Sequence, residues 1–505
     1  MPIAGWEDPD PADVLVLAGD AEWQTLAARY PSRNGEPLRR CLEVARSNGA
    51  LSVVIETRYM DPDYRSEYAA LYARTFASQP DTAVRLHFFK APLAADQLWQ
   101  LPLDHGYLGY LIIRPTELGR VGRSMLVPPP GLEDAALTAV DERVHFFGQT
   151  LSVRGVPFMQ QDAQLDRCAH AAAWVCHYSA FRRGMVARRP IAAFNLMADL
   201  SLGRSRSIPS DGLTAGQLVE LFRVFDLPAR LYEIGALPPI IPAPPGAPPD
   251  PVPKTDANGQ VLPGGMWDTR LFGTVCRYLN SGLPVLVATK DHAFVLCGYR
   301  RRPRANDRDW IEFIRQDDQR GPYLNVDNVF NDSAASGHSY GPWRILIVPL
   351  PEKLWLPPEP AEGVGSRLME RVATVNVKAV PDAKTLLDII ASGTIAFRTY
   401  ATAANDFKEK CLGRLPNELT REYRLARFSR LIWVVEAIDK AARDRGEGSH
   451  VLGEAIFDAT SSEYAPAPLA VHVPGLAWLV STTGSLREVR CAPDRYSSGT
   501  GGTLS

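Results

Sequence analysis

Two proline-rich segments set the main limits on how this chain can fold. Residues 237–265 contain ten prolines and four glycines, and a second proline cluster covers residues 350–360. Proline has no backbone N–H to donate, so neither segment can lie inside a helix or a central strand. We expect residues 237–265 to form an exposed loop or a lid over a site, and residues 350–360 to form a linker between domains.

The length of 505 residues is too great for one compact core, so we expect several domains. Residues 1–155 alternate helical and strand patterns, which predicts an N-terminal α/β domain of unknown role. Residues 156–350 form the expected central domain, with residues 237–265 as an insert. Residues 361–505 are expected to form a C-terminal α/β domain of unknown role, in which residues 423–439 have a helical pattern.

The composition gives no sign of a broad nucleic-acid surface or of a membrane span. There are 55 basic and 57 acidic residues, for a net charge of −2, and a large nucleic-acid surface requires a clear basic excess. No apolar run approaches the roughly 18 residues that cross a bilayer, and the N-terminus lacks the basic and apolar regions of a signal peptide. The seven cysteines form no Cys-X-X-Cys pair, so the simplest expectation is a reducing, cytoplasmic location.

Cys168 is the candidate nucleophile. It lies where the polar segment Gln-Gln-Asp-Ala-Gln-Leu-Asp-Arg (160–167) gives way to an alanine-rich helix expected at 168–181. A cysteine in the first helical turn is close to the positive end of the helix dipole and to unpaired backbone N–H groups, which favour the thiolate. The same N–H groups can stabilise an oxyanion.

His292 and Asp317 are the candidate base and the acid that orients it. His292 precedes the apolar strand expected at 293–299, so its side chain is expected at the rim of a sheet. If Tyr299 pairs with Trp310 at the next turn, the antiparallel register places Asp317 opposite His292. A carboxylate there can accept the Nδ1–H of the imidazole and hold the useful tautomer. A shift of register by one residue would bring Asp318 to this position instead.

Gln161 is the candidate oxyanion donor. It precedes Cys168 by seven residues, and a side-chain amide at that distance can lie beside the thiol. Gln160 and Gln164 are the alternatives for this role.

At these residues the chain resembles the papain-like cysteine peptidase superfamily, and it is most similar to the bacterial branch that includes the double-glycine leader peptidases. The resemblance covers residues 156–350 and rests on Gln161, on Cys168 at a helix start, on Gly-Leu-Pro-Val at 282–285, on His-Ala-Phe-Val-Leu-Cys-Gly-Tyr at 292–299, and on Asp317. It implies a helical lobe carrying the cysteine, packed against an antiparallel sheet carrying the histidine and the aspartate. It also implies peptide-bond cleavage through an acyl-enzyme, without a metal or organic cofactor. The chain departs from papain in having Asp166-Arg167 before the cysteine, and this leaves the substrate class open.

The expected fold class is therefore α+β and multidomain, with a central papain-like domain flanked by α/β domains. The expected function is a cysteine peptidase or related hydrolase that acts on a peptide or protein substrate through a thioester. A thiol-dependent transglutaminase or deamidase, and a non-catalytic papain-like scaffold, are the two alternatives. The sequence does not indicate an oligomeric state.

A zinc site formed by Cys168, His170, Cys176 and His177 is not expected. Successive residues of a helix are about 100° apart, so these four side chains point in different directions and cannot surround one ion. His170 and His177 are expected on the polar side of the helix.

Overall fold

A computed structural model describes residues 12–76, 78–99, 106–116, 119–164, 167–195, 212–234, 269–302, 310–326, 343–481 and 484–498. The chain divides into two compact units. Unit 1 comprises Met1–Leu271 and Leu283–Leu350, and unit 2 comprises Phe272–Gly282 and Pro351–Ser505. The proline-rich insert at 237–265 lies outside the described residues. Among the described residues, no helix combines the length and the apolar character that a membrane span requires.

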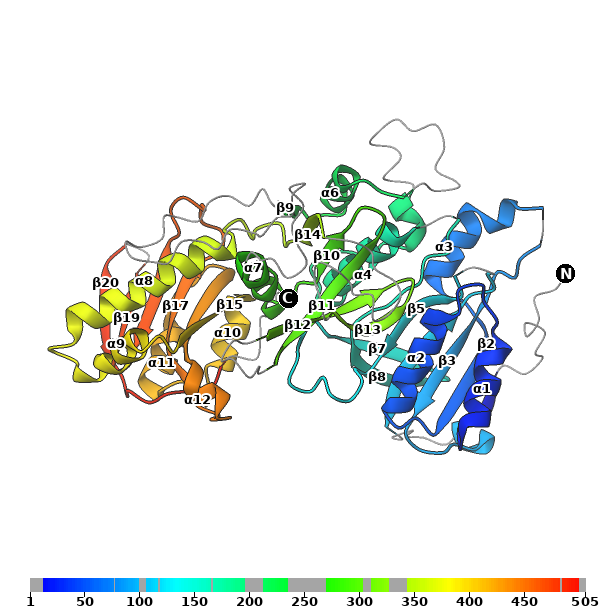
Figure 1. The fold of residues 1–505 in the computed structure, drawn as a ribbon, viewed down its shortest axis with the longest axis horizontal. Helices are drawn as coiled ribbons and strands as arrows, with labels where there is room; N and C mark the ends of the chain where they lie inside the picture. The colour runs from blue at the N-terminus through cyan, green and yellow to red at the C-terminus, as the bar shows by residue number, and fades with distance from the viewer. Residues whose placement is uncertain are drawn as a thin grey trace, which may run out of the picture. The chain divides into compact units, whose positions relative to one another are not determined.

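The first sheet of unit 1 has five antiparallel strands in the order of the chain (Figure 1). Its strands are β1 (Ala12–Val16), β2 (Ser52–Tyr59), β3 (Ala83–Phe89), β4 (Tyr107–Ile113) and β5 (Val121–Leu126). The helices α1 (Asp20–Arg29) and α2 (Glu36–Ser47) pack on one face, where the apolar side of α2 meets alternate residues of β2 and β3. The other face is covered by α3 (Pro62–Ala70), the short helix η1 (Tyr72–Arg74) and the hairpin of β7 (Val140–Phe146) and β8 (Gln149–Gly155).

The second sheet of unit 1 is also antiparallel, in the order β13-β12-β11-β10-β14-β9. Its strands are β9 (Ala229–Glu233), β10 (Val285–Ala288), β11 (Ala293–Arg302), β12 (Trp310–Asp317), β13 (Gly321–Val326) and β14 (Ile345–Pro349). A two-residue strand, β6 (Ala136–Leu137), also pairs with β11. It crosses close to Gly298, where a Cβ atom would lie 2.7 Å from the carbonyl oxygen of Ala136. A glycine is therefore required there.

The helix α4 (Cys168–Arg182) lies between the two sheets of unit 1 and belongs to a core shared by both (Figure 1). This core includes Tyr110 of the first sheet, Trp174 of α4 and Val295 of the second sheet, each at most 1% exposed. A second helix, α6 (Ala215–Val224), packs against α4 and β9. The expected boundary near residue 155 therefore falls inside unit 1, because residues on both sides of it share one core.

A buried ionic network fixes α4 to the first sheet. The guanidinium of Arg123 on β5 lies 3.0 Å from an oxygen of Asp61 and 2.8 Å from one of Glu142. Two side chains of α4 bind the same group of acids: Trp174 Nε1–H donates to Asp63 Oδ1 at 3.0 Å, and the Tyr178 hydroxyl donates to Glu142 Oε1 at 3.0 Å. The helix that begins with Cys168 is thus held by hydrogen bonds as well as by apolar packing.

Replacement of Arg123 with alanine is expected to destabilise unit 1 by about 3–5 kcal/mol, because the change leaves buried carboxylates without their guanidinium. The matched control is Arg154→Ala, whose ion pair with Asp141 is mostly exposed and should contribute no more than about 1 kcal/mol. Urea titration followed by hydrogen exchange of α4 peptides reports on unit 1 alone. Equal losses for the two variants would contradict a role for this network in holding α4.

Unit 2 is built on one six-stranded antiparallel sheet, again in the order of the chain. Its strands are β15 (Ile395–Ala403), β16 (Leu431–Asp439), β17 (Val451–Asp458), β18 (Pro468–Val473), β19 (Leu476–Val480) and β20 (Leu486–Arg490). The helix α8 (Pro358–Asn376) crosses one face of the sheet (Figure 1). Gly365 of α8 allows this close packing, since a Cβ atom there would lie 3.2 Å from the side chain of Val435. The remaining helices are α9 (Lys384–Ala391), α10 (Ala404–Lys410), α11 (Asn417–Leu425) and α12 (Lys440–Asp444), with short helices η2 (Ala95–Trp99) in unit 1 and η4 (Pro381–Ala383) in unit 2.

The helix α7 (Thr269–Asn280) is contributed to unit 2 by the middle of the chain, although we expected this segment within the central domain. Arg277 of α7 forms an ion pair with Glu362 of α8 at 2.6 Å, and the Thr274 hydroxyl donates to Glu359 Oε1 at 2.6 Å. The proline cluster at 350–360 is not a free linker either, since Leu354 and Leu356 are buried and α8 begins at Pro358.

The fold class is α+β with several antiparallel sheets, as expected, but the flanking regions are not of the α/β type. Every strand pairing among the described residues is antiparallel. Most consecutive strands of the sheets in residues 12–155 and 361–498 are neighbours, and parallel pairs would need long crossover connections. The helix predicted at 423–439 ends at Leu425, the last residue of α11, and residues 431–439 instead form the strand β16, which is buried on both faces.

Candidate active site

Cys168 is the first residue of α4. The preceding Arg167 has an extended backbone, and its N–H donates to Nδ1 of His170 at 3.2 Å. His170 thus takes the place that a glutamate has in a capping box, and this contact fixes the residue at which the helix begins. All seven cysteines are free thiols, of which Cys168 and Cys491 are partly exposed and the other five are buried.

His292 is held in a tight turn between β10 and β11. Its backbone N–H donates to the Thr289 hydroxyl at 3.1 Å, and the Thr289 N–H donates to the carbonyl oxygen of His292 at 2.9 Å. The imidazole is buried, with 2% of the side chain exposed. The turn therefore fixes the backbone of His292 at the rim of the second sheet, next to the start of α4.

The side chain of His292 joins Cys168 to Asp317. Its Nε2 lies 3.2 Å from Asp317 Oδ1 at the end of β12, and the imidazole also forms a side-chain hydrogen bond with Cys168. The expectation that Asp317 accepts the Nδ1–H is wrong, because Nε2 faces the carboxylate. In this orientation Nδ1 lies on the side of the ring away from the Asp317 carboxylate.

The strand register differs from the one we used to predict this contact. Tyr299 pairs with Phe313 rather than with Trp310, and Arg302 pairs with Trp310. The strands extend further into the turn than expected, and a bulge lies between Leu296 and Gly298. Asp317 therefore lies diagonal to His292 rather than directly opposite, and it still reaches the imidazole because it ends β12 at the same rim.

Gln319 is a residue of this site that the incorrect register concealed. Its side-chain amide lies 3.4 Å from Nδ1 of His292, and its backbone N–H donates to Asp317 Oδ1 at 3.0 Å. The observed register, continued from Val295 and Gln316, runs to Gln319 opposite His292. A correct prediction of the turn length alone would have led to Arg320, and the bulge between Leu296 and Gly298 shifts the register by one residue to Gln319.

The charges around the imidazole favour its protonated form. Burial lowers the pKa of His292, but the hydrogen bonds with Asp317 and Cys168 and the charges of Asp317 and Asp318 outweigh it and raise the pKa to about 10. Burial also raises the pKa of Asp317, but the hydrogen bond and charge of His292, followed by the charge of Arg315, bring it below its ordinary value. The buried pair is thus an imidazolium–carboxylate pair at neutral pH.

Asp318 brings a second carboxylate to the same nitrogen. Its Oδ1 lies 3.8 Å from Nε2 of His292, and 4% of its side chain is exposed. Burial is the main cause that raises the pKa of Asp318 to about 7; the charge of His292 opposes this shift and that of Asp317 adds to it. The backbone N–H of Gln161 also faces this carboxylate and lowers its pKa. The segment that contains Gln161 is therefore next to the His292 and Asp317 side chains.

The three candidate glutamines differ in what they can do. The side chain of Gln160 is already used: its Oε1 accepts the N–H of Val121 at 3.1 Å, and its Nε2 donates to the carbonyl oxygen of Asn34 at 3.0 Å. Gln164 is exposed. Gln161 is half-buried with its backbone close to Asp318, so it stays the candidate oxyanion donor.

The two histidines of α4 are not on a polar side of the helix, as we expected. His170 and His177 are both at most 1% exposed, and burial lowers the pKa of each to about 4. The ring of His177 packs edge-on against Phe194 and Phe225. The error has a simple cause: α4 lies between two sheets and is buried on nearly all sides, so it has no polar face.

His292, Asp317 and Asp318 are close enough to hold a metal ion, since one ligand atom from each lies within 4.8 Å of the others. Two features oppose a cation there. Nε2 of His292 and the Asp317 carboxylate are at hydrogen-bond distance, and Nε of Arg315 lies 3.4 Å from Asp317 Oδ2. A buried guanidinium beside the ligands would repel a metal ion. These contacts favour an ion pair within the cluster over a bound metal ion.

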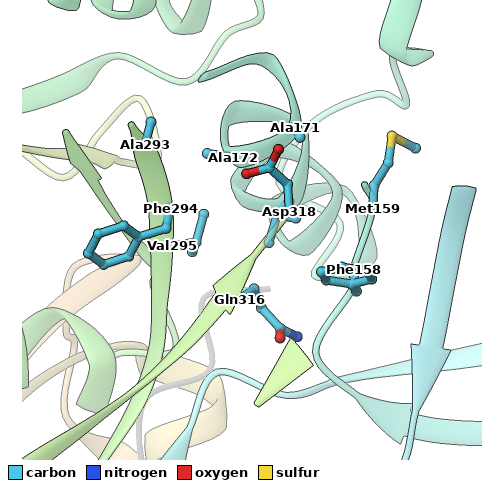
Figure 2. A pocket seen from close by; sticks show the side chains of 10 residues that line it. Phe158, Met159, Ala171, Ala172, Ala293, Phe294, Val295, Gln316 and Asp318 are labelled. Carbon is cyan, nitrogen blue, oxygen red and sulfur yellow. The ribbon is translucent and has the colours of Figure 1, made fainter. Parts of the chain in front are cut away.

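A small cavity of about 10 Å³ lies beside the cluster, between α4 and the second sheet (Figure 2). Most of its wall is apolar, and Gln316 and Asp318 are the polar lining residues. The side-chain amide of Gln316 donates to the carbonyl oxygens of Val156 and Pro157. Asp318 is therefore the ionisable group that this cavity adjoins.

The raised pKa of His292 predicts that stability falls as the pH rises. The folded protein retains this proton up to about pH 10, whereas an unfolded histidine loses it near 6.5. The contribution is complete below pH 6.5 and is lost between about pH 6.5 and 10. The raised pKa of Asp318 also makes stability fall as the pH rises, but over a lower range, from about pH 4 to 7. One pKa unit corresponds to about 1.4 kcal/mol, so several kcal/mol should be lost above pH 7.

Urea unfolding of wild type and His292→Gln at pH 7, 8, 9 and 10 measures this contribution. The difference in unfolding free energy between the two proteins should shrink as the pH rises. A difference that stays constant across this range would contradict the imidazolium–carboxylate pair.

Comparisons with known proteins supply no relative for this chain. No protein-family model matches it, and no curated protein and no solved structure is significantly similar to it. The function is therefore argued from the site alone.

Proposed function

We propose that unit 1 is a papain-like cysteine hydrolase that cleaves peptide bonds, with Cys168 as nucleophile, His292 as acid–base and Asp317 as the group that orients it. The observation that carries this proposal is that one imidazole contacts both the thiol at a helix start and a buried carboxylate. A thiol, an imidazole and an orienting acid in that order form the arrangement that activates a cysteine nucleophile.

The proposed reaction begins from an ion pair in which Cys168 has already given its proton to His292, so that a thiolate lies beside an imidazolium. The thiolate attacks the carbonyl carbon of a peptide bond, and the charge passes to the carbonyl oxygen. When the tetrahedral intermediate collapses, the C–N bond breaks and the proton of His292 goes to the leaving amine. This leaves a thioester on Cys168. Water then gives a proton to His292 and attacks the thioester. The C–S bond breaks, the carboxylic acid leaves, and the thiolate–imidazolium pair is regenerated.

The surroundings of Cys168 suit the charges that develop in this reaction. Cys168 is the first residue of α4, and the positive end of a helix dipole lies at its first turn. This positive end stabilises the thiolate and the oxyanion, and the amide of Gln161 is proposed as a further donor. Asp317 accepts from Nε2 and directs Nδ1 of the imidazolium to the substrate.

The fold of unit 1 supports the resemblance to the papain-like superfamily in outline. The helix that begins with Cys168 packs against an antiparallel sheet, and the rim of that sheet carries His292 and Asp317. The large first sheet and the buried network that holds α4 go beyond what the resemblance implied. A peptide or protein is the proposed substrate.

Mass spectrometry of a peptide library after incubation with the protein tests this proposal. New N-termini should appear with wild type, and they should be absent with Cys168→Ala and with His292→Ala. Release of ammonia without chain cleavage would point instead to the deamidase or transglutaminase reaction of the same thiol. No reaction of either kind across a broad library would favour a non-catalytic scaffold.

A further inference from the structure

Asp318 has no evident structural role, although it is buried. Neither of its carboxylate oxygens has a hydrogen-bond partner of standard geometry among the described residues. Buried carboxylates in stable proteins are normally paired, because an unpaired one costs free energy. The neighbouring Asp317, in contrast, accepts hydrogen bonds from His292 and from the backbone of Gln319.

Asp318 lies close to several groups of the candidate active site. Its Oδ1 lies 3.8 Å from Nε2 of His292, and the N–H of Gln161 also faces it. It also lines the cavity whose wall includes Ala171 and Ala172 of α4, one turn after Cys168 (Figure 2). These small side chains leave space for the carboxylate beside the helix.

We propose that Asp318 is a positioning residue for the hydrolysis: its carboxylate is a second negative charge beside His292 Nε2 that helps Asp317 to retain the imidazolium. This inference rests on the proposed function and adds a fourth group to the site. The charged groups that face Asp318 are His292 from the β10–β11 turn and Asp317 from β12, whereas α4 and β11 present apolar side chains to it.

The proposal implies a dependence on pH that Asp317 alone would not produce. Asp318 ionises near pH 7, since its pKa is raised to about 7. Below this pH it is neutral and adds no charge at His292. Above this pH its negative charge strengthens the hold on the imidazolium proton, which acylation, the first half of the reaction cycle, delivers to the leaving amine. The form with a protonated His292 should therefore persist to a higher pH than it would if Asp317 were the only carboxylate beside the imidazole.

NMR titration of the His292 ring, with histidine-selective ¹⁵N labelling of the full chain, tests the inference directly. The chain has nine histidines, and His292→Gln assigns the signal. Asp318→Asn keeps the shape of the side chain and removes its charge, so the pKa of His292 should fall by about one unit. Asp291→Asn is the matched control, since Asp291 is adjacent in sequence but exposed, and it should leave the titration unchanged.

An unchanged His292 titration in folded Asp318→Asn would overturn the inference. If that variant does not fold, wild type supplies the test: the His292 ring signals should show an additional step near pH 7 as Asp318 ionises, and the lack of that step would equally overturn it.

The titration separates this inference from the proposed function, because it needs no substrate and can be repeated in the Cys168→Ala background. If hydrolysis also occurs, kcat/KM of Asp318→Asn should match wild type near pH 6 and fall several-fold near pH 10. A shifted titration in a protein that cleaves nothing would retain the role of Asp318 at His292 and reject the hydrolase. Hydrolysis together with an unshifted titration would retain the hydrolase and reject the role of Asp318 at His292.

Discussion

Replacement of Cys168 with serine is expected to lower kcat for peptide hydrolysis on the order of 10⁵- to 10⁶-fold, the size of loss found when the nucleophile of a triad is removed. The change replaces one atom and keeps the shape of the side chain. A serine hydroxyl beside the same imidazole does not form the ion pair on which the proposed reaction depends, because it is far less acidic than a thiol. The assay follows cleavage of a peptide selected as a wild-type substrate.

Cys491→Ser is the matched control, because Cys491 is the other partly exposed cysteine and lies in unit 2. Burial and the charge of Glu418 raise the pKa of its thiol to about 11, so it should not act as a nucleophile at neutral pH. Full activity in Cys168→Ser, or an equal loss in Cys491→Ser, would contradict the assignment of the nucleophile.

Replacement of Asp317 with asparagine is expected to lower kcat by about 10⁴-fold, as the same change does in a serine-protease triad. Asparagine can donate a hydrogen bond where the carboxylate only accepts, so the imidazole loses both its orientation and the charge that stabilises its protonated form. The pKa of His292 should fall in this variant by more than in Asp318→Asn, because Asp317 lies 3.2 Å from Nε2 and Asp318 lies 3.8 Å away.

Comparison of the single variants with the double variant of Asp317 and Asp318 shows which carboxylate orients the ring. A loss of less than about tenfold in Asp317→Asn, together with a large loss in Asp318→Asn, would assign the orienting role to Asp318. Asp291→Asn controls for the removal of one negative charge near the turn, since its side chain is exposed.

The sequence was sufficient to select the candidate residues but not the geometry that joins them. The loop-to-helix transition at Cys168 and the polar start of an apolar strand at His292 are local patterns, and the structure has both. The pairing of β11 with β12 depends on the turn between them, and a bulge and longer strands changed its register. The prediction of Asp317 was still useful despite the error in register, because this residue ends β12. A small shift of register at a strand end leaves the residue at the same rim of the sheet.

Burial on both sides explains the largest errors in secondary structure and side-chain environment. The segment Leu-Ile-Trp-Val-Val at 431–435 is apolar on both faces of β16, so it lacks the alternation that identifies a half-exposed strand. For the same reason the helix α4 has no polar face, and His170 and His177 could not be placed correctly from spacing alone. Hydrophobic periodicity arises where one face of an element meets the core and the other meets solvent. The strand β16 and the helix α4 have no solvent-exposed face, so they lack this periodicity.

The division of the chain into units could not be derived from local patterns either. The segment 272–282 leaves unit 1 and contributes to unit 2, where Arg277 pairs with Glu362. Residues on both sides of position 155 share one core around Trp174. These contacts join residues that are about 85 or more positions apart in sequence, and no pattern within a short window contains them.

Site-resolved alkylation of the cysteines across pH 5–9, compared between wild type and His292→Ala, tests the central claim most directly because it requires no substrate. The proposed ion pair predicts that Cys168 reacts fast below pH 7 in wild type, that Cys491 does not, and that Cys168 loses this reactivity without His292. If Cys168 reacts no faster than Cys491, or reacts equally fast in both proteins, His292 does not activate the thiol and the hydrolase proposal is wrong.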